Sequence, residues 1–296
     1  MATLPVVGPT GGAPAPYRSP AAAMWRRFRR NPLALGGGVI IGALVAVAVG
    51  APYLSPYDPA HQALADKLMG PTARHWLGTD EFGRDVLSRL IFGSRVELAV
   101  GLASVLIGLV LGTLLGTVAA YRGGVADELT MRALDVLLAF PYLLLAILVV
   151  SVLGANLRST ILAVGLWATP GFARVIRGLV LTIAGQEYVE ASRAIGARTA
   201  RIILRHVLPN CISVLIVYAA LYMASAILLE AALSFLGLGV QPPTSSWGLM
   251  ISTGRDYLLE APHIATFAGL AIAFTVLGFN LFADGLRDAL DTKLTL

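Results

Sequence analysis

Long stretches without charged residues divide the chain into segments that can cross a membrane. Five such stretches are 31–57, 98–121, 136–157, 207–229 and 261–283. A helix needs roughly 20 apolar residues to cross the 30 Å of hydrocarbon in a bilayer. A sixth stretch, 159–173, is shorter and reaches about 22 residues only if Arg174 and Arg177 extend their charged ends to the membrane surface. The pattern therefore predicts six spans, of which the fourth along the chain is the weakest.

Small residues are frequent inside these stretches, and three glycines in the second are regularly spaced. Gly108, Gly112 and Gly116 follow one another at intervals of four, which places them on one face of a helix. In a membrane, such a row of small residues lets two helices approach closely. The alternative is a set of glycines tolerated on a face that contacts lipid.

Arginines set the predicted orientation. Arg26, Arg27, Arg29 and Arg30 directly precede the first stretch, and cytoplasmic segments of membrane proteins carry an excess of such charges. With six spans, 15 Lys and Arg residues fall on this side and 7 on the other. The N-terminus and the C-terminus are both predicted to be cytoplasmic.

The connections complete the predicted organisation. The first stretch is too long for the apolar part of a signal peptide, so it is interpreted as a retained anchor. Apolar residues at helical spacing from Val86 to Ile91 predict an interfacial helix before the second span. The resulting division is a tail at 1–30, the first span at 31–57, an external loop at 58–97, a core at 98–285 with an internal loop at 182–208, and a tail at 286–296.

Composition supports a membrane protein and excludes several other classes. Apolar residues make up 57% of the chain and charged residues 13%, against about 25% charged residues in soluble proteins. The single cysteine, Cys211, excludes a disulfide framework. Four dispersed histidines give no metal-binding pattern. Neither lysine, Lys67 nor Lys293, has the glycines of a phosphate-binding P-loop, so no ATP site of that class is expected. The positive net charge is interpreted as a topology signal and not as a sign of nucleic acid binding.

Acidic residues near the spans bear on two other classes of function. Asp135, Glu230 and Asp284 all fall close to the predicted ends of spans. An ion-coupled carrier needs acids near the middle of the membrane, and a membrane enzyme needs polar residues that converge within the spans. Neither pattern is visible, although both classes stay open as alternatives.

The internal loop has the most specific pattern. From Gln186 to Asn210 it alternates apolar residues with arginines, which predicts two short amphipathic helices. Gly196 separates them, where a positive φ or a close backbone approach is allowed. Pro209 suits the first turn of the next span. A helical elbow of this kind is a surface that a soluble partner can grip.

This loop resembles the EAA loop of binding-protein-dependent ABC importer permeases. Glu190, Ala191 and Ser192 occupy the E-A-A positions, Gly196 matches the glycine, and Leu208 and Pro209 match the end. Ser192 and His206 depart mildly from the pattern. The chain from about 25 to 295 resembles the C-type permease subunit of the dipeptide, oligopeptide and nickel branch, through the segments 77–95, 121–124, 233–248 and 279–294.

The resemblance implies an all-α, six-span permease of the type I importer fold in the bacterial inner membrane. It implies a non-catalytic subunit without a cofactor or metal of its own, with ATP and Mg²⁺ held by one or two separate ATPase subunits. A homologous companion permease and an external substrate-binding lipoprotein would complete the importer. The implied substrate is a di- or oligopeptide, with nickel or another small solute as the alternative. The path would be formed jointly with the companion, from the second, third, fifth and sixth spans.

The resemblance also implies roles for particular residues. The loop would dock on the ATPase, with Glu190 facing it, and the residues assigned to this contact are Glu190, Ala191, Ser192, Arg193, Gly196, Arg198, Leu208 and Pro209. The alternatives for Glu190 are a solvated acid on the helix surface and an ion pair with Arg193 or Arg198. Contacts with the companion or the external protein are expected at Gly78, Asp80, Gly83, Arg84, Asp85, Pro242, Pro243 and Trp247. Trp247 is also expected at the membrane interface.

Overall fold

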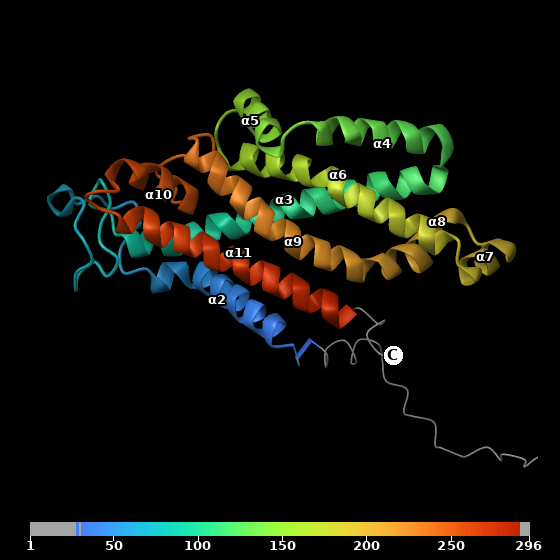
Figure 1. The fold of residues 1–296 in the computed structure, drawn as a ribbon, viewed down its shortest axis with the longest axis horizontal. Helices are drawn as coiled ribbons and strands as arrows, with labels where there is room; N and C mark the ends of the chain where they lie inside the picture. The colour runs from blue at the N-terminus through green and yellow to red at the C-terminus, as the bar shows by residue number, and fades with distance from the viewer. Residues whose placement is uncertain (1–27, 30, 291–296) are drawn as a thin grey trace, which may run out of the picture.

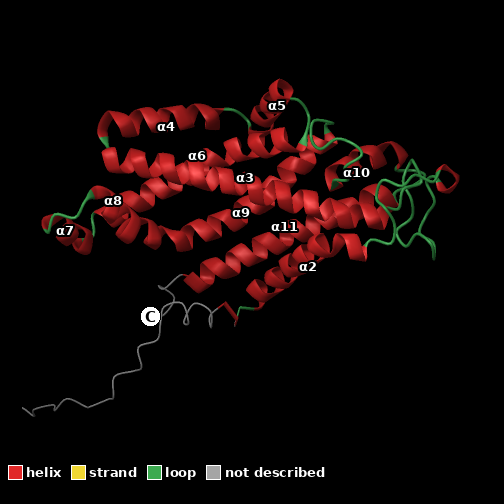
Figure 2. Ribbon diagram, turned by 180° about the vertical axis from the view of Figure 1, so that it is seen from behind, coloured by secondary structure: helices red, strands yellow, loops and turns green. Residues whose placement is uncertain are grey.

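The computed structural model describes residues 28, 29 and 31–290, and this part of the chain is an elongated helical bundle (Figure 1, Figure 2). Residues 1–27 and Arg30, which belong to the predicted tail at 1–30, and residues 291–296, with Lys293, lie outside the described residues. The longer helices are α2 (Pro32–Leu54), α3 (Val86–Arg122), α4 (Gly124–Ala139), α5 (Tyr142–Leu153), α6 (Leu157–Ala184), α9 (Leu208–Phe235) and α11 (His263–Leu290). The short ones are η1 (Leu64–Asp66), α7 (Glu187–Ala194), α8 (Thr199–Ile202), η2 (Ile203–Val207), α10 (Trp247–Gly254) and η3 (Arg255–Tyr257).

Five segments of the described chain are long and apolar enough to cross a membrane, and α4 with α5 makes a sixth if the bent pair counts as one span. The sequence pattern predicts that the fourth span is the least certain. In the structure it is the third, because only the bent pair of α4 and α5 can supply it. α6 is an unbroken helix of 28 residues, whereas α4 and α5 meet at 92°. Phe140 before Pro141 is extended, with ψ of 134°, because proline disfavours the helical conformation in the residue that precedes it.

The second span is longer than predicted. No separate interfacial helix precedes it, because α3 runs for 37 residues from Val86 to Arg122 without a break. Asp85 begins the helix by accepting a hydrogen bond from the Ser88 N–H at 2.7 Å, as an N-cap does. The outer turns of α3 are buried on one face although they carry Ser88, Arg89 and Glu97. This polar face packs against other parts of the protein and not against a membrane surface.

The glycine row of the second span lies against α6. A β-carbon at Gly108 would stand 2.6 Å from that of Ala168, and one at Gly112 would stand 2.7 Å from the Thr169 carbonyl. At Gly116 a β-carbon would overlap Ile176 and Ala173. The row is therefore a packing surface, which confirms the first of the two interpretations. The glycines of α2 differ from one another. A β-carbon at Gly37 would overlap the backbone of Phe282, whereas one at Gly36 or Gly42 would meet no atom within 4 Å.

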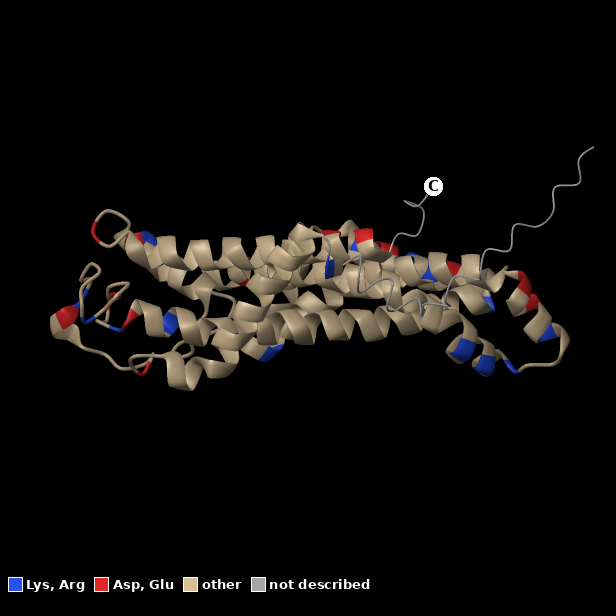
Figure 3. Cartoon of the chain, turned by 90° about the horizontal axis from the view of Figure 1, so that it is seen from below, with Lys and Arg blue, Asp and Glu red and all other residues tan. Residues whose placement is uncertain are grey.

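Charged residues are concentrated toward the two ends of the bundle, and a smaller group lies near its middle (Figure 3). One end carries α7 and α8, and the other carries the loop at 55–85 with α10 (Figure 1). The first is the end predicted to face the cytoplasm, and it is called the coupling end below. The second is called the external end. These two ends contain the residues that the sequence singles out.

Candidate functional site

At the coupling end, α7 projects beyond the bundle and turns back at Gly196 (Figure 1). The Gly196 N–H donates to the Arg193 carbonyl at 2.9 Å, and the Ala197 N–H donates to the Ser192 carbonyl at 3.1 Å. This pair of bonds is the Schellman arrangement, which requires a left-handed residue after the helix. Gly196 has φ of 82°, and a β-carbon there would meet no atom within 4 Å. The glycine thus serves the positive φ and not a close approach.

Few side chains hold this elbow to the bundle. Val189 is fully buried on one face of α7, and the Arg193 guanidinium lies 5.6 Å from the centre of the Tyr121 ring at the end of α3. Tyr188 packs edge-on against His206, with the ring centres 6.3 Å apart. The Ser192 hydroxyl donates to the Tyr188 carbonyl at 2.8 Å and stays within α7. The elbow is positioned mainly by its backbone and by one apolar anchor.

The outer surface of the elbow is open to solvent in this chain. Glu190, Ala191, Arg193 and Arg198 are exposed, and Ile195 is 86% exposed. Among the described residues, Glu190 has no ion pair within 4 Å with Arg193, Arg198 or any other cation. The intramolecular ion pair considered for Glu190 is therefore absent from this structure. The elbow presents an exposed carboxylate and an exposed apolar side chain next to several arginines.

The segment after the elbow joins the next span without a gap. α8, the π-helical turn η2 and α9 follow one another directly, and Thr199–Phe235 is one membrane-length helix. Pro209 sits just after the π-helical turn, where widened hydrogen bonding accommodates a residue that cannot donate. Ile202 and Val207 are buried and fix this segment to the bundle. A displacement of the elbow would therefore be carried directly into α9.

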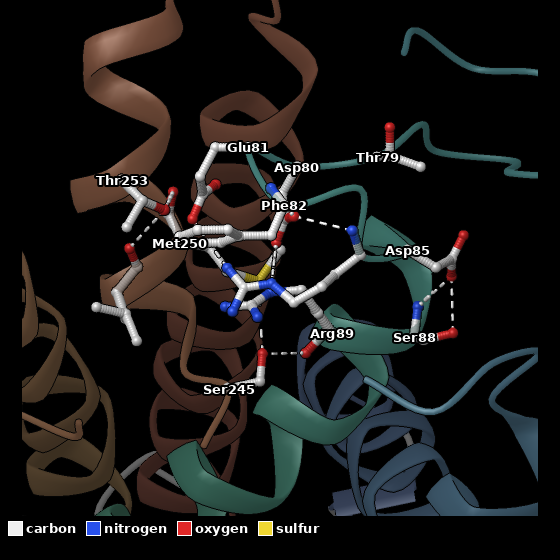
Figure 4. A network of polar contacts seen from close by, with 12 residues as sticks. Thr79, Asp80, Glu81, Phe82, Asp85, Ser88, Arg89, Ser245, Met250 and Thr253 are labelled. Carbon is white, nitrogen blue, oxygen red and sulfur yellow. Dashed lines mark hydrogen bonds and ion pairs between the residues drawn. The ribbon is translucent and has the colours of Figure 1, made fainter. Parts of the chain in front are cut away.

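At the external end, Asp80 is the centre of a buried polar network (Figure 4). Its Oδ1 accepts hydrogen bonds from the N–H groups of Phe82 and Arg84, both at 2.9 Å. Its Oδ2 pairs with the guanidinium of Arg84 at 2.7 Å and with that of Arg89 at 3.3 Å. Arg84 also donates to Glu81 at 2.8 Å. Burial and the neighbouring Asp80 raise the pKa of Glu81 above its usual value.

Close backbone approaches surround this network. A β-carbon at Gly78 would stand 2.5 Å from the Met69 carbonyl, and one at Gly83 would overlap the Ala63 carbonyl. Both glycines also have positive φ, of 81° and 72°. Asp85 accepts from the Ser88 hydroxyl at 2.7 Å and lies 3.0 Å from His75 Nδ1. The loop before α3 is therefore tightly packed and hydrogen-bonded. It is called the external layer below.

Two buried glutamates attach the segment 236–247, which connects α9 to α10, to the bundle. Glu97 of α3 accepts a hydrogen bond from the Trp247 N–H at 3.1 Å, and Glu230 of α9 accepts from the Ser234 hydroxyl at 2.6 Å. The Trp247 indole N–H donates to the Leu90 carbonyl at 2.9 Å. Both glutamates are fully buried. The sequence pattern misses Glu97 because it stands one residue before the second uncharged stretch.

Burial changes the interpretation of the external residues. Gly78, Asp80, Gly83, Arg84, Asp85 and Trp247 are buried within this chain. Trp247 is 3% exposed and packs against Gly93, and its expected position at the membrane interface stays a prediction. These six residues hold the external layer together. Pro242 and Pro243 are exposed, and contact with another subunit stays a prediction for them.

Two protein families and several individual proteins match this chain. The family described as "Binding-protein-dependent transport system inner membrane component" matches residues 108–296. A second, "N-terminal TM domain of oligopeptide transport permease C", matches residues 19–71. The chain is 44% identical over 295 residues to a glutathione transport system permease protein of Pectobacterium atrosepticum, covering 99% of this chain and 96% of the relative. It is 45% identical over 282 residues to a protein of that name from Escherichia coli, covering 95% and 93%.

Solved structures with a similar fold include the MetNI methionine ABC transporter in an inward-facing conformation. The TM-score is 0.57 at 19% identity, and the match covers 69% of this chain and 98% of the solved chain. A second crystal form of that transporter gives the same TM-score at 18% identity. At this identity the likeness concerns the fold.

Proposed function

This chain belongs to the family of binding-protein-dependent transport system inner membrane components, and on that premise we propose that it is the subunit through which an ABC importer moves short peptides of the glutathione type. Its place is the inner membrane, as a multi-pass permease. In this family the permease is non-catalytic, and ATP hydrolysis belongs to partner subunits. A companion permease, ATPase subunits and an external binding protein are the partners that the family implies.

The peptide substrate is supported by the relatives. Two proteins that match nearly the whole chain at 44% and 45% identity are named as glutathione transport permeases, and glutathione is a tripeptide. The N-terminal family match is likewise described by oligopeptide transport. We therefore propose a tripeptide or a peptide of similar size as the substrate.

The geometry that carries the coupling part of the proposal is the exposed elbow at Gly196. Its Glu190 carboxylate has no intramolecular ion pair among the described residues, and the helix that follows continues into α9. A cytoplasmic ATPase that grips this elbow would move α9 when it closes on ATP. Alternating access then requires only that nucleotide binding favours one of two arrangements of the bundle.

The experiment compares two glutamates in the complete importer. The chain, its companion permease and the ATPase subunits are reconstituted in vesicles with ATP inside and the binding protein with labelled glutathione outside. Glu190→Ala is expected to lower uptake about tenfold, the effect of losing one charged hydrogen bond, while ATP hydrolysis stays within about twofold. Glu128→Ala is the matched control, because Glu128 is an exposed acid on α4, outside the elbow.

Two results would contradict separate parts of the proposal. Unchanged uptake by the Glu190→Ala importer would remove the elbow from coupling. If the unaltered importer hydrolyses ATP normally and takes up no glutathione or other short peptide, the substrate class is wrong.

A further inference from the structure

One face of α6 is unusual because it carries charge within a membrane-length helix. Arg174 lies ten residues before the end of α6 at Ala184, about 15 Å along the helix axis. Arg174 pairs with Asp135 of α4 at 2.5 Å, and their side chains are 53% and 51% exposed. Charged side chains within a spanning helix usually pair with each other or face a water-filled passage. Arg174 and Asp135 pair with each other, and about half of each side chain stays exposed within this chain.

The neighbouring ion pair is built differently. Arg177 donates two hydrogen bonds to Asp127, from Nε and from Nη2, both at 2.6 Å. Its side chain is 35% exposed and that of Asp127 is 18% exposed. Arg174, in contrast, donates a single hydrogen bond, from Nη2 to Asp135 Oδ1. Arg177 and Asp127 therefore join α6 to α4 through two hydrogen bonds. Arg174 uses one N–H group for Asp135, so its guanidinium has further N–H groups that can bind another acceptor.

Aromatic rings lie on the same face of α6, two turns toward the external end. Trp167, Gly171 and Arg174 follow one another at intervals of four and three, so they share one face. The Trp167 ring lies 6.0 Å from that of Tyr142 on α5 and 5.3 Å from that of Tyr222 on α9. Tyr142 is exposed, and Trp167 and Tyr222 are partly exposed. These five residues are called the aromatic–arginine face below.

The spacing of this face fits a short peptide. Trp167 and Arg174 are seven residues apart, about 10 Å along the helix, and three extended residues span about 10 Å. Guanidinium groups bind carboxylates with charge-assisted hydrogen bonds, and aromatic rings pack against apolar side chains.

A second open surface of the bundle lacks these groups. A groove of about 740 Å³ lies between α3 and α9, and its walls include Leu109, Leu114, Ile212 and Ile216. None of its lining residues is charged. A peptide with a free carboxylate would find no ion partner there, which leaves the aromatic–arginine face as the better match.

Resting on the proposed function, we propose that the aromatic–arginine face is a peptide-binding wall of the translocation path, in which Arg174 receives the terminal carboxylate of the peptide. Asp135 holds the Arg174 guanidinium in position when no peptide is present and is displaced by the substrate carboxylate. This places the fourth span in the wall of the path, beside the third and the fifth.

The test compares two forms of one peptide in the complete reconstituted importer: glutathione and its amide at the glycine carboxyl group. The binding protein is the same in every sample, so its own preference cancels when each variant is divided by the unaltered importer. Arg174→Gln is expected to lower glutathione uptake about tenfold and to change uptake of the amide less than about twofold. Arg174→Lys, which keeps the charge, is expected to recover part of the loss.

Two further variants separate binding from a structural role. If the Arg174–Asp135 pair only stabilises the bundle, Asp135→Asn will be as harmful as Arg174→Gln. The proposal instead expects Asp135→Asn to keep at least about half of the glutathione uptake, because the substrate carboxylate replaces Asp135. Arg132→Gln is the matched control, since Arg132 is also exposed and paired with an acid of α4.

Four results would overturn the proposal. Equal losses for glutathione and its amide in Arg174→Gln, or equal losses in Arg174→Gln and Asp135→Asn, would show a structural role. Normal glutathione uptake by Arg174→Gln would remove Arg174 from the path and leave the proposed function intact. An unaltered importer that transports neither peptide form would contradict both proposals at once.

Discussion

The two ends of this permease are built by opposite means. At the external end, buried side chains bond to one another and to backbone groups, with Asp80 alone holding two backbone N–H groups and two guanidinium groups. At the coupling end, the backbone makes the turn, and Val189 is the buried anchor of α7. The external end buries most of the polar groups of its network within this chain, whereas the coupling end leaves its polar groups exposed.

This difference indicates where binding energy is still available. A carboxylate that is already buried and paired, such as Asp80, has nothing further to offer a partner. An exposed and unpaired carboxylate, such as Glu190, can form a new ion pair without breaking an old one. Substitutions at the external end should therefore act mainly on stability, and those at the coupling end mainly on transport.

The largest expected effect is that of Asp80→Ala. The change leaves Arg84 and Arg89 buried without their shared carboxylate, and breaking a buried ion pair costs about 3–5 kcal/mol. Thermal unfolding of the purified permease complex measures the loss. Asp58→Ala is the matched control at the same end, because Asp58 is exposed and bonds only locally, to the Ala60 N–H. Similar stability losses in the two variants would show that the Asp80 network does not hold the external layer.

A smaller effect is expected from Gly196→Ala at the coupling end. A β-carbon there meets no atom within 4 Å, so the cost is only the strain of a positive φ, about 1–2 kcal/mol. We expect little change in thermal unfolding of the bundle, together with a clear loss of glutathione uptake as the elbow changes direction. Both are measured on the reconstituted importer.

Gly269→Ala is the control for that substitution. Gly269 lies inside α11 without positive φ, and a β-carbon there also meets nothing within 4 Å. Alanine in a helix interior is neutral or favourable. If Gly196→Ala transports as well as Gly269→Ala, the left-handed turn is dispensable for coupling.

The coupling end is also the part that the sequence predicts best. The turn at Gly196 depends on the residues from Ser192 to Ala197, which are neighbours along the chain, so a local pattern is sufficient. The glycine row of α3 is likewise visible as a local spacing. The external end depends on residues far apart in the sequence. Glu97 and Trp247 are separated by 150 positions, so no local sequence pattern predicts the hydrogen bond between them.

Two prolines within the spans also show that a local sequence pattern does not predict the structure. Pro141 precedes a break of 92° between α4 and α5, while α6 continues through Pro170. Pro170 removes one hydrogen bond inside α6, whereas Pro141 is the N-cap of α5, where its missing N–H costs no helical bond. Pro170 is buried, and its neighbours Thr169 and Phe172 pack against α3 and the Tyr222 ring of α9, which supports the helix on both sides. Pro141 is exposed and lacks such support. The outcome is decided by tertiary packing that the sequence does not display locally.

The smallest expected effect is that of Glu81→Gln at the external end, on how the stability of the protein depends on pH. Burial and the nearby Asp80 raise the pKa of Glu81 above its usual 4.5 in the folded protein. The folded state therefore binds this proton more tightly than the unfolded state, and the contribution of Glu81 to stability falls as pH rises from 4.5 through the raised value. Glu81→Gln removes that fall, so the unfolding temperature of the variant minus that of the unaltered protein should increase over this range. Glu260→Gln, which removes an exposed acid from the same end, is the control for the loss of one carboxylate. A difference that stays constant or decreases with pH would mean that Arg84 compensates the burial of Glu81 completely, and the external network would then be as indifferent to ionisation as the open surface of the elbow.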